Sequence, residues 1–137
     1  MSREPVALER DERFGSRDRL LQREQFQDCY RKGQRLSRHF VNVHVRANDE
    51  GRARLGITAS RKVGKAHVRQ RTKRRLREIF RRWPERNGLP AVDIVLHVKP
   101  HAGAADFEAL RRDVASALRL VRSGELKREG RSRRRRS

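Results

Sequence analysis

The apolar residues of this chain follow two kinds of repeating pattern, and the first kind predicts helices. Residues 23–32, 65–82 and 107–121 carry apolar positions three and four residues apart, which is the spacing of one helix face. Gly33 follows the first segment as a helix-ending residue, and Asp106 precedes the third as an N-cap. We therefore predict three amphipathic helices. Their apolar positions are Phe26, Cys29 and Tyr30; Val68, Leu76, Ile79, Phe80 and Trp83; and Phe107, Leu110, Val114, Ala117, Leu118 and Val121.

The second kind of pattern predicts β-strands in residues 39–46, 54–59 and 92–98. In the first two segments apolar and polar residues alternate, as they do in strands with one buried face. The turn-forming residues 48–51 separate these two strands, so we expect them to pair as a hairpin. Residues 92–98 are more apolar, which favours a central position in the sheet.

The order of these elements predicts a small single-domain α+β sandwich in which helices pack against a mixed sheet. The order is α-β-β-(β)-α-β-α, where the strand in brackets is optional. A chain of 137 residues is expected to hold one folded domain, which we place at residues 14–122. We expect residues 1–13 to be a disordered leader. Residues 123–137 are expected to be a disordered basic tail, because residues 131–137 include no apolar side chain.

The charge balance indicates what kind of partner the domain has. The chain has 37 basic and 17 acidic residues, a formal net charge of +20, and 31 of the basic residues are Arg. Residues 14–122 alone carry a net charge of +16, so the charge lies mainly on the part that folds. Such a chain repels itself unless an anionic partner neutralises it. Nucleic acid is the first candidate and an anionic membrane surface the second, and the planar guanidinium of Arg favours phosphates and bases.

Several other classes of function find no support in the sequence. No apolar run approaches the ~20 residues of a membrane span, and the N-terminus lacks the apolar segment of a secretory signal. The single cysteine, Cys29, cannot form an internal disulfide or a cysteine-rich zinc site, which fits a reduced, cytoplasmic setting. The five histidines and the scattered carboxylates form no metal or acid–base pattern. We therefore predict no catalytic residue and no metal site in the protein.

The most informative segment is the basic helix predicted over residues 65–82. It has nine basic residues and a single acid, Glu78. On a helical wheel the cations fill nearly all of the arc outside the apolar stripe. Like charges one turn apart destabilise a helix by roughly 0.2–0.5 kcal/mol each, so we expect an anionic partner to shield this face.

This helix and its neighbours resemble the protein subunit of bacterial ribonuclease P. Residues 69–78 are similar to the Arg-rich helix of that family, and residues 55–64 to the strand and turn that precede it. Gln70 and Lys65 stand where the family usually has Asn. The match runs in order from about residue 14 to residue 121. Its upstream and downstream parts, which resemble the family's first helix and last strand, are residues 19–20, 26–33 and 93–95.

The resemblance implies that the chain is the protein subunit of a ribonucleoprotein endoribonuclease that matures the 5′ ends of tRNA. In that family the RNA subunit is the catalyst and binds most of the Mg²⁺ that activates water, so the protein has no intrinsic cofactor. The implied partners are the catalytic RNA and precursor tRNA, with a monomeric protein and no membrane. The family also has a left-handed βαβ crossover, which is uncommon among proteins and is expected here.

The resemblance also assigns two sets of binding residues. The 5′ leader of precursor tRNA is implied to bind Arg17, Arg19, Phe26 and Tyr30, because single strands bind aromatic rings beside a basic groove. Phe26 also fits an ordinary position in the core. Contacts with the RNA subunit are implied for Arg61, Lys62, Lys65, Arg69, Gln70, Arg71, Lys73, Arg74 and Arg77.

Two other functions stay open at this point. A ribosomal or general RNA-binding protein would share the charge and a similar scaffold, and a self-contained nuclease would cleave RNA without a partner. Reconstitution with the cognate RNA separates them, because only a ribonuclease P subunit promotes leader removal at low Mg²⁺. A self-contained nuclease would stay active after its RNA had been digested away.

Overall fold

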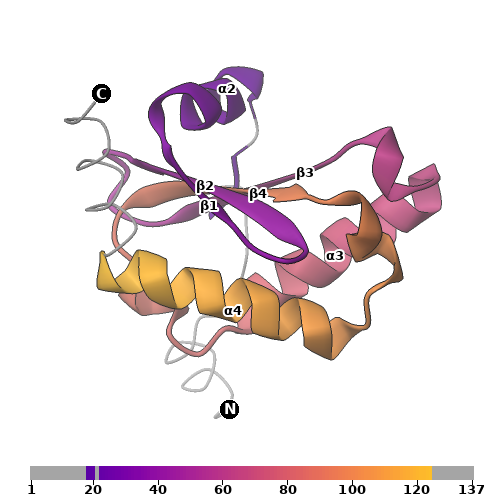
Figure 1. Cartoon of the computed structure of the whole chain (residues 1–137). Coiled ribbons are helices and arrows are strands. Elements are labelled where there is room, and N and C mark those ends of the chain that lie inside the picture. Colours follow the sequence, from indigo (N-terminus) through magenta and orange to yellow (C-terminus); the bar gives the residue numbers. More distant parts are fainter. Residues whose placement is uncertain (1–17, 21, 125–137) are drawn as a thin grey trace, which may run out of the picture.

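The computed structural model describes residues 18–20 and 22–124, which form one sheet with helices on both faces (Figure 1). The predicted leader, residues 1–13, and residues 125–137 of the predicted tail lie outside the described residues. The helices are α2 (Arg23–Lys32), α3 (Ala66–Arg82) and α4 (Phe107–Ser123). The strands are β1 (Gln34–Ser37), β2 (Val41–Ala47), β3 (Arg54–Ala59) and β4 (Val92–Val98), and the short 3-10 turns are η2 (Arg61–Val63), η3 (Arg86–Gly88) and η4 (Pro100–Ala104).

The three predicted helices are present and end near the expected residues. Asp106 caps α4, since its carboxylate accepts a hydrogen bond from the backbone N–H of Ala109 at 2.7 Å. Gly33 ends α2, and its N–H donates to the carbonyl of Cys29 at 3.0 Å. These local signals therefore placed the helix ends correctly.

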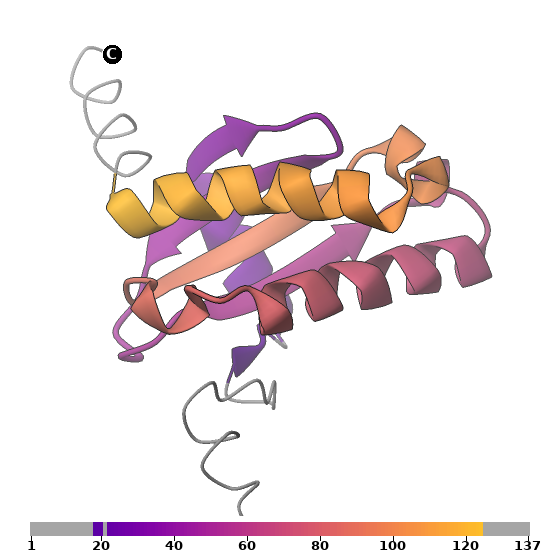
Figure 2. The same ribbon diagram turned by 90° about the horizontal axis from the view of Figure 1, so that it is seen from below.

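The elements form three layers. Helix α2 covers one face of the sheet, while α3 and α4 lie side by side on the opposite face (Figures 1 and 2). Within the described residues the sheet has four strands in the order β1-β2-β4-β3, with both antiparallel and parallel pairs. This arrangement confirms the predicted α+β class and mixed sheet.

The pairing of the strands corrects one expectation. Strands β2 and β3 do not form a hairpin: β2 pairs antiparallel with β1 and β4, and β3 pairs parallel with β4 and has one isolated bridge to Arg19. Strand β4 is buried along nearly all of its length and takes the central position between them, as its apolar sequence predicted. The hairpin partner of β2 is instead β1, a short polar strand that apolar periodicity did not detect.

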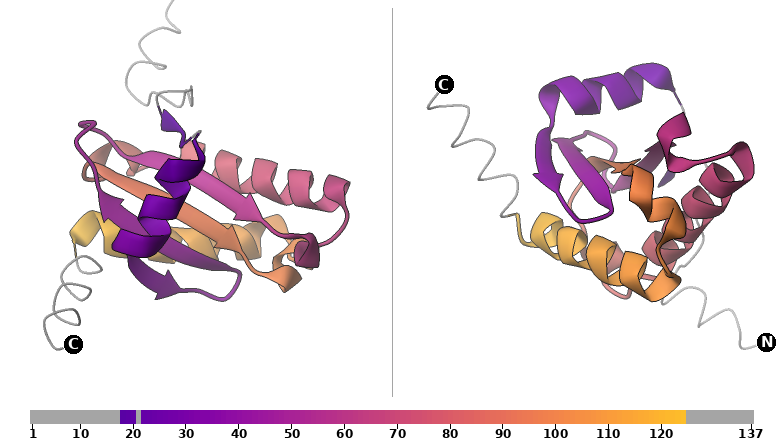
Figure 3. Two further views of the ribbon diagram at one scale, coloured as in Figure 1. Left: turned by 90° about the horizontal axis from the view of Figure 1, so that it is seen from above. Right: turned by 45° about the vertical axis from the view of Figure 1, so that its right-hand side comes forward.

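The connection from β3 through α3 to β4 is left-handed. Viewed from the α2 side, β3 and β4 both run toward the right, β4 lies below β3, and α3 passes behind the sheet (Figure 3, left). This path turns in the opposite sense to the usual right-handed crossover. The crossover expected from the family resemblance is therefore present.

The main hydrophobic core lies between the sheet and the α3–α4 layer. Its largest fully buried side chains come from both layers. On the α2 side, a much smaller cluster joins Leu20, Cys29 and Val95. The fold is therefore anchored on one face, and most of the other face is lined by polar side chains. The fully buried members of the main core include Val41, Val43, Leu55, Leu76, Phe80, Ile94, Leu96, Leu110 and Leu118.

Candidate nucleic-acid interface

The cations of α3 occupy the helix surface that packing leaves free. Thr72, Leu76, Ile79 and Phe80 are the buried residues of the helix, so the positions around them project away from the core. No acidic residue lies in the first turn. The predicted basic face is therefore present as a surface of the folded domain.

One flank of this face is fixed by contacts with backbone carbonyls. Arg71 donates to the carbonyl of Gly103 at 3.2 Å, and Arg75 to that of Ala105 at 3.2 Å. These bonds hold the two guanidinium groups toward η4 while leaving donors for a phosphate. Arg75 was absent from the predicted contact residues, although its neighbours were included.

The opposite flank of α3 turns toward α2 and β3. There Lys73 and Arg77 line a pocket of about 240 Å³ together with Arg19 and Phe26. Burial lowers the pKa of Arg77, and the positive charges of Arg19 and Arg74 lower it further. This pocket is therefore a site where several cations repel one another and where an anion would relieve the repulsion.

The position of Phe26 depends on a glycine in the neighbouring strand. A Cβ atom at Gly56 would lie 2.6 Å from Cε2 of Phe26. The glycine thus lets the ring rest directly on β3, where it is half-buried against the small cluster of Leu20 and Cys29. Phe26 therefore packs as a partial core residue and also lines the pocket. A position in the core and a contact with the leader are compatible for this residue.

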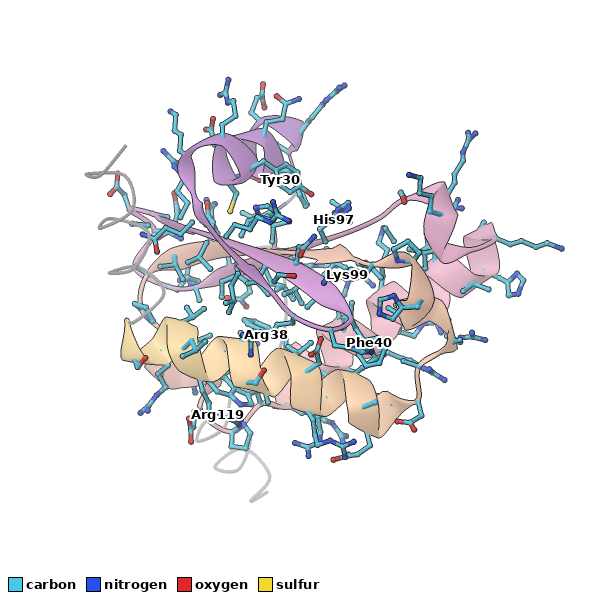
Figure 4. The ribbon with its side chains drawn as sticks, in the orientation of Figure 1. Tyr30, Arg38, Phe40, His97, Lys99 and Arg119 are labelled. Carbon is cyan, nitrogen blue, oxygen red and sulfur yellow. The ribbon has the colours of Figure 1, made fainter. Side chains whose placement is uncertain are left out.

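Tyr30 lies one helical turn further along α2 and reaches the open part of the sheet. It is 37% exposed, and its hydroxyl is 2.8 Å from Oγ1 of Thr58 on β3. Thr58 Oγ1 is in turn 2.8 Å from Nδ1 of His97 on β4. Figure 4 shows Tyr30 and His97 on the same side of the sheet. We use the name α2 groove for the pocket beside Phe26 together with the adjoining surface of Tyr30, Thr58, His44 and His97, whose side chains contact one another.

A second histidine stands edge-on to the same tyrosine ring. The ring centroids of Tyr30 and His44 are 4.7 Å apart at an interplanar angle of 88°. Burial, followed by the positive charge of Arg35 and the proximity of His97, lowers the pKa of His44 to about 4. His44 is therefore neutral at pH 7 and acts in the α2 groove as a polar aromatic ring without charge.

The structure joins residues that the sequence placed in two separate sets. Lys73 and Arg77, assigned to the RNA subunit, share one pocket with Arg19 and Phe26, assigned to the leader. Arg69 lies partly buried and donates to the carbonyl of Gly64 at 2.8 Å. The other predicted contact residues on η2 and α3 are exposed: Arg61, Lys62, Lys65, Gln70, Arg71 and Arg74. Arg17 lies outside the described residues.

Sequence reasoning missed the strand residues of the α2 groove. Thr58 and His97 come from strands that are far apart in the chain, and only the parallel pairing of β3 with β4 places them opposite one another. The alternation of apolar and polar residues over 39–46 places His44 on the polar face of its strand, and it lies there. Alternation predicts the face of a residue, but it does not predict the neighbouring strand.

The described residues offer no evident place for a metal ion. Among residues 18–20 and 22–124, no group of three or more His, Cys, Asp or Glu side chains could hold one. In the same part of the chain, no helix has the length and apolar character needed to cross a membrane.

The fold and its cationic surfaces define a small basic α+β domain of the nucleic-acid-binding class. A family model described as Ribonuclease P matches residues 14–122. The ribonuclease P protein component of Desulfovibrio desulfuricans is 46% identical over 106 residues, which are 76% of this chain and 80% of that protein. The component from Thermus aquaticus is 45% identical over 102 residues, which are 74% of this chain and 56% of that protein.

Solved structures agree with the sequence relatives. The RNase P protein from Thermotoga maritima has a TM-score of 0.65 and 33% identity, covering 73% of this chain and 94% of that one. The Staphylococcus aureus RNase P protein has a TM-score of 0.68 and 27% identity, covering 75% and 94%. The chain therefore belongs to the ribonuclease P protein family, the protein component of the endoribonuclease complex that matures tRNA 5′ ends. The resemblance to this family and the expected role in maturing tRNA 5′ ends are confirmed.

Proposed function

We propose that this protein binds two RNAs at once: the catalytic RNA of ribonuclease P through α3, and the 5′ leader of precursor tRNA through the α2 groove. In this arrangement the protein supplies binding energy and orientation, and the RNA subunit cleaves the precursor. The observation that carries the proposal is the shared pocket, where Phe26 meets Lys73 and Arg77. A leader held there lies beside the helix that docks the catalytic RNA.

The α3 surface suits a folded RNA because its cations are numerous and exposed. Arg61 and Lys62 on η2 continue the exposed positions of α3 at its N-terminal end. Neutralising phosphates with such residues releases counterions, so binding should weaken steeply with salt. Gln70 is exposed and can offer an amide group, one methylene further from the helix than the Asn usual in the family.

The α2 groove suits a single strand because it combines exposed rings with nearby cations. Tyr30 presents an exposed ring, Phe26 a half-buried one, and Arg19 lies at the same end of the groove as Phe26. Aromatic stacking holds unpaired bases with roughly 1–3 kcal/mol per base. A mature tRNA, which lacks the leader, would lose these contacts.

The chemistry of cleavage is assigned to the partner. When bound, mainly by the RNA subunit, Mg²⁺ supplies an activated water and stabilises charge at the phosphate. The chain's own residues hold the leader and its phosphates in place. We further propose that the protein is monomeric within the complex and that the complex works in the cytoplasm.

The proposal is tested by reconstituting the complex with the cognate RNA and comparing the Kd values of precursor and mature tRNA. Replacing Tyr30 by Ala and Phe26 by Leu should reduce the preference for precursor about five- to tenfold, since stacking is weakened. Arg119→Ala changes an exposed cation on α4 and serves as the control. An unchanged preference in the double variant contradicts leader binding in the groove.

The role of α3 is tested separately. Arg74→Ala should weaken assembly with the RNA subunit. It should also lower the slope of log Kd against log salt by about one, the amount that corresponds to one lost phosphate contact. An unaltered slope removes this residue from the RNA interface. If the protein binds RNA but does not promote leader removal at low Mg²⁺, it is instead a general RNA-binding protein.

A further inference from the structure

A cluster of three aromatic rings lies outside both surfaces described above. His39 and Phe40 belong to the turn between β1 and β2, and His101 belongs to η4 beyond the end of β4. The ring centroids are 4.5 Å apart for His39 and Phe40, and 5.0 Å apart for His39 and His101. Phe40 packs partly against the main core, whereas both imidazole rings are exposed. We call these three residues the ring cluster.

The ring cluster is held by hydrogen bonds from three parts of the chain. Nε2 of His101 donates to the carbonyl of His39 at 2.8 Å. The carboxylate of Asp113 on α4 accepts the backbone N–H groups of His39 and Phe40, at 3.1 and 2.8 Å. The N–H of Lys99 donates to the carbonyl of Phe40 at 2.9 Å. The rings are therefore preorganised, and a base that stacks on them requires little further ordering.

Two cations belong to the segments that hold the ring cluster: Arg38 precedes His39, and the backbone of Lys99 is bonded to Phe40. Figure 4 labels both cations. Nζ of Lys99 donates to the hydroxyl of Ser37 at 2.9 Å and to the carbonyl of Arg38. The guanidinium of Arg38 donates to Oγ of Ser116 at 3.2 Å. Within residues 18–20 and 22–124, neither cation has a carboxylate at ion-pair distance. Both charges are thus positioned by neutral partners and remain available to a phosphate.

Lys99 connects the α2 groove with the ring cluster, which lies at the end of the sheet and packs toward α4. Lys99 follows His97 by two residues, so strand alternation places both on the face that α2 covers. In Figure 4, Tyr30 and His97 lie on the α2 side of the sheet, Phe40 and Arg38 lie on the α4 side, and Lys99 lies between them. The α2 groove meets α3 at β3, which forms one edge of the sheet. The β1–β2 turn, which carries His39 and Phe40, lies at the other edge.

We propose that the ring cluster binds a leader nucleotide beyond those in the α2 groove, with its base on the rings and its phosphate near Lys99 and Arg38. Rings beside cations are the combination that binds single-stranded nucleic acid. The proposal rests on the proposed function, because the leader must first occupy the groove. The end of the groove at α3 adjoins the catalytic RNA, so the ring cluster receives nucleotides farther from the cleavage site.

The test measures Kd for precursor tRNAs whose unpaired leaders are lengthened one nucleotide at a time, using the reconstituted complex. For the wild-type protein, affinity should rise as the leader enters the groove and rise again when it reaches the ring cluster. In the His39→Ala, His101→Ala double variant, the second rise should be lost, which is about a fivefold weakening for long leaders. Affinity for short leaders should stay unchanged.

Two further variants separate stacking from other causes. His39→Phe keeps a ring at the turn and should retain the second rise, whereas Arg119→Ala removes an exposed cation on α4 and should change neither rise. A second rise that survives in the double variant, or that is missing in wild type or in His39→Phe, overturns the ring cluster proposal alone. If wild type does not prefer precursor over mature tRNA, both proposals fail.

Discussion

The two faces of the sheet differ in what covers them. On one face, two helices of 17 residues each bury a continuous aliphatic core. On the other, a single helix of ten residues covers part of the sheet, and the side chains beneath and beside it are largely polar. The comparison indicates that one face supplies most of the stability, which leaves the second face free to bind a ligand.

Polar and charged side chains are prominent even in the part of the second face that α2 covers. Asp93 is 2% exposed, and its carboxylate accepts hydrogen bonds from Arg54 at 2.9 and 3.0 Å and from Asn48 at 2.7 Å. Cys29 lies fully buried beside this ion pair, and burial raises the pKa of its thiol to about 12. The α2 side is therefore ordered mainly by hydrogen bonds and charge, with a small apolar contribution.

The largest expected effect comes from the aliphatic face. Leu118 is fully buried in α4, and Leu118→Ala should lower the free energy of unfolding by about 2–5 kcal/mol because a cavity remains. Denaturant unfolding measures this loss. The folded variant, reconstituted with RNA, should bind precursor tRNA as wild type does. Leu120→Ala, at a half-buried position of the same helix, should cost clearly less. A loss of leader preference in Leu118→Ala contradicts the division between the two faces.

Gly56→Ala should destabilise the protein less than Leu118→Ala does, and it should weaken leader binding more. The added methyl group of Gly56→Ala collides with Phe26, and displacing that ring should cost about 1–3 kcal/mol of unfolding free energy. The preference for precursor tRNA should fall as well, since the ring lines the groove. In a Phe26→Ala background, the same substitution should cost much less stability. Equal costs in both backgrounds exclude the collision as the cause.

The smallest effect is a pH dependence of stability that arises at His44. Because its pKa is about 4 in the folded protein against 6.5 when unfolded, the unfolded chain binds more protons between these values. Stability is therefore complete above pH 6.5 and declines as the pH falls toward 4. For a half-buried group, about 1–2 kcal/mol is expected after solvent screening. His44→Gln should flatten this part of the profile, and an identical slope in the variant contradicts the assignment.

Prediction from the sequence was most accurate where the signal is local. The helix spacing around Leu76 and the N-cap Asp106 depend on residues within one or two turns, and both were placed correctly. The hairpin expected between residues 39–46 and 54–59 was wrong, because strand pairing depends on which apolar strand takes the centre of the sheet. The predicted order allowed a third strand before the basic helix, and β1 makes that number, but its residues were not assigned because its four residues include a single apolar one.

The binding residues also divide into those set by local sequence and those set by long-range contacts. The cations of α3 could be identified from the sequence, because a helix that buries one stripe must expose the others. The meeting of Arg77 with Phe26 and the contact of Tyr30 with Thr58 could not, because each joins segments that are far apart in the chain.

The sequence by itself determined the helices, the positive charge of the domain and its family. Tertiary structure decided the strand order, the side of the sheet on which α2 packs and the residues that line its groove. The physical reason is range: helix periodicity and charge are properties of neighbouring residues. Strand pairing is selected by the burial of the whole sheet, which brings residues such as Thr58 and His97 together only when the chain has folded.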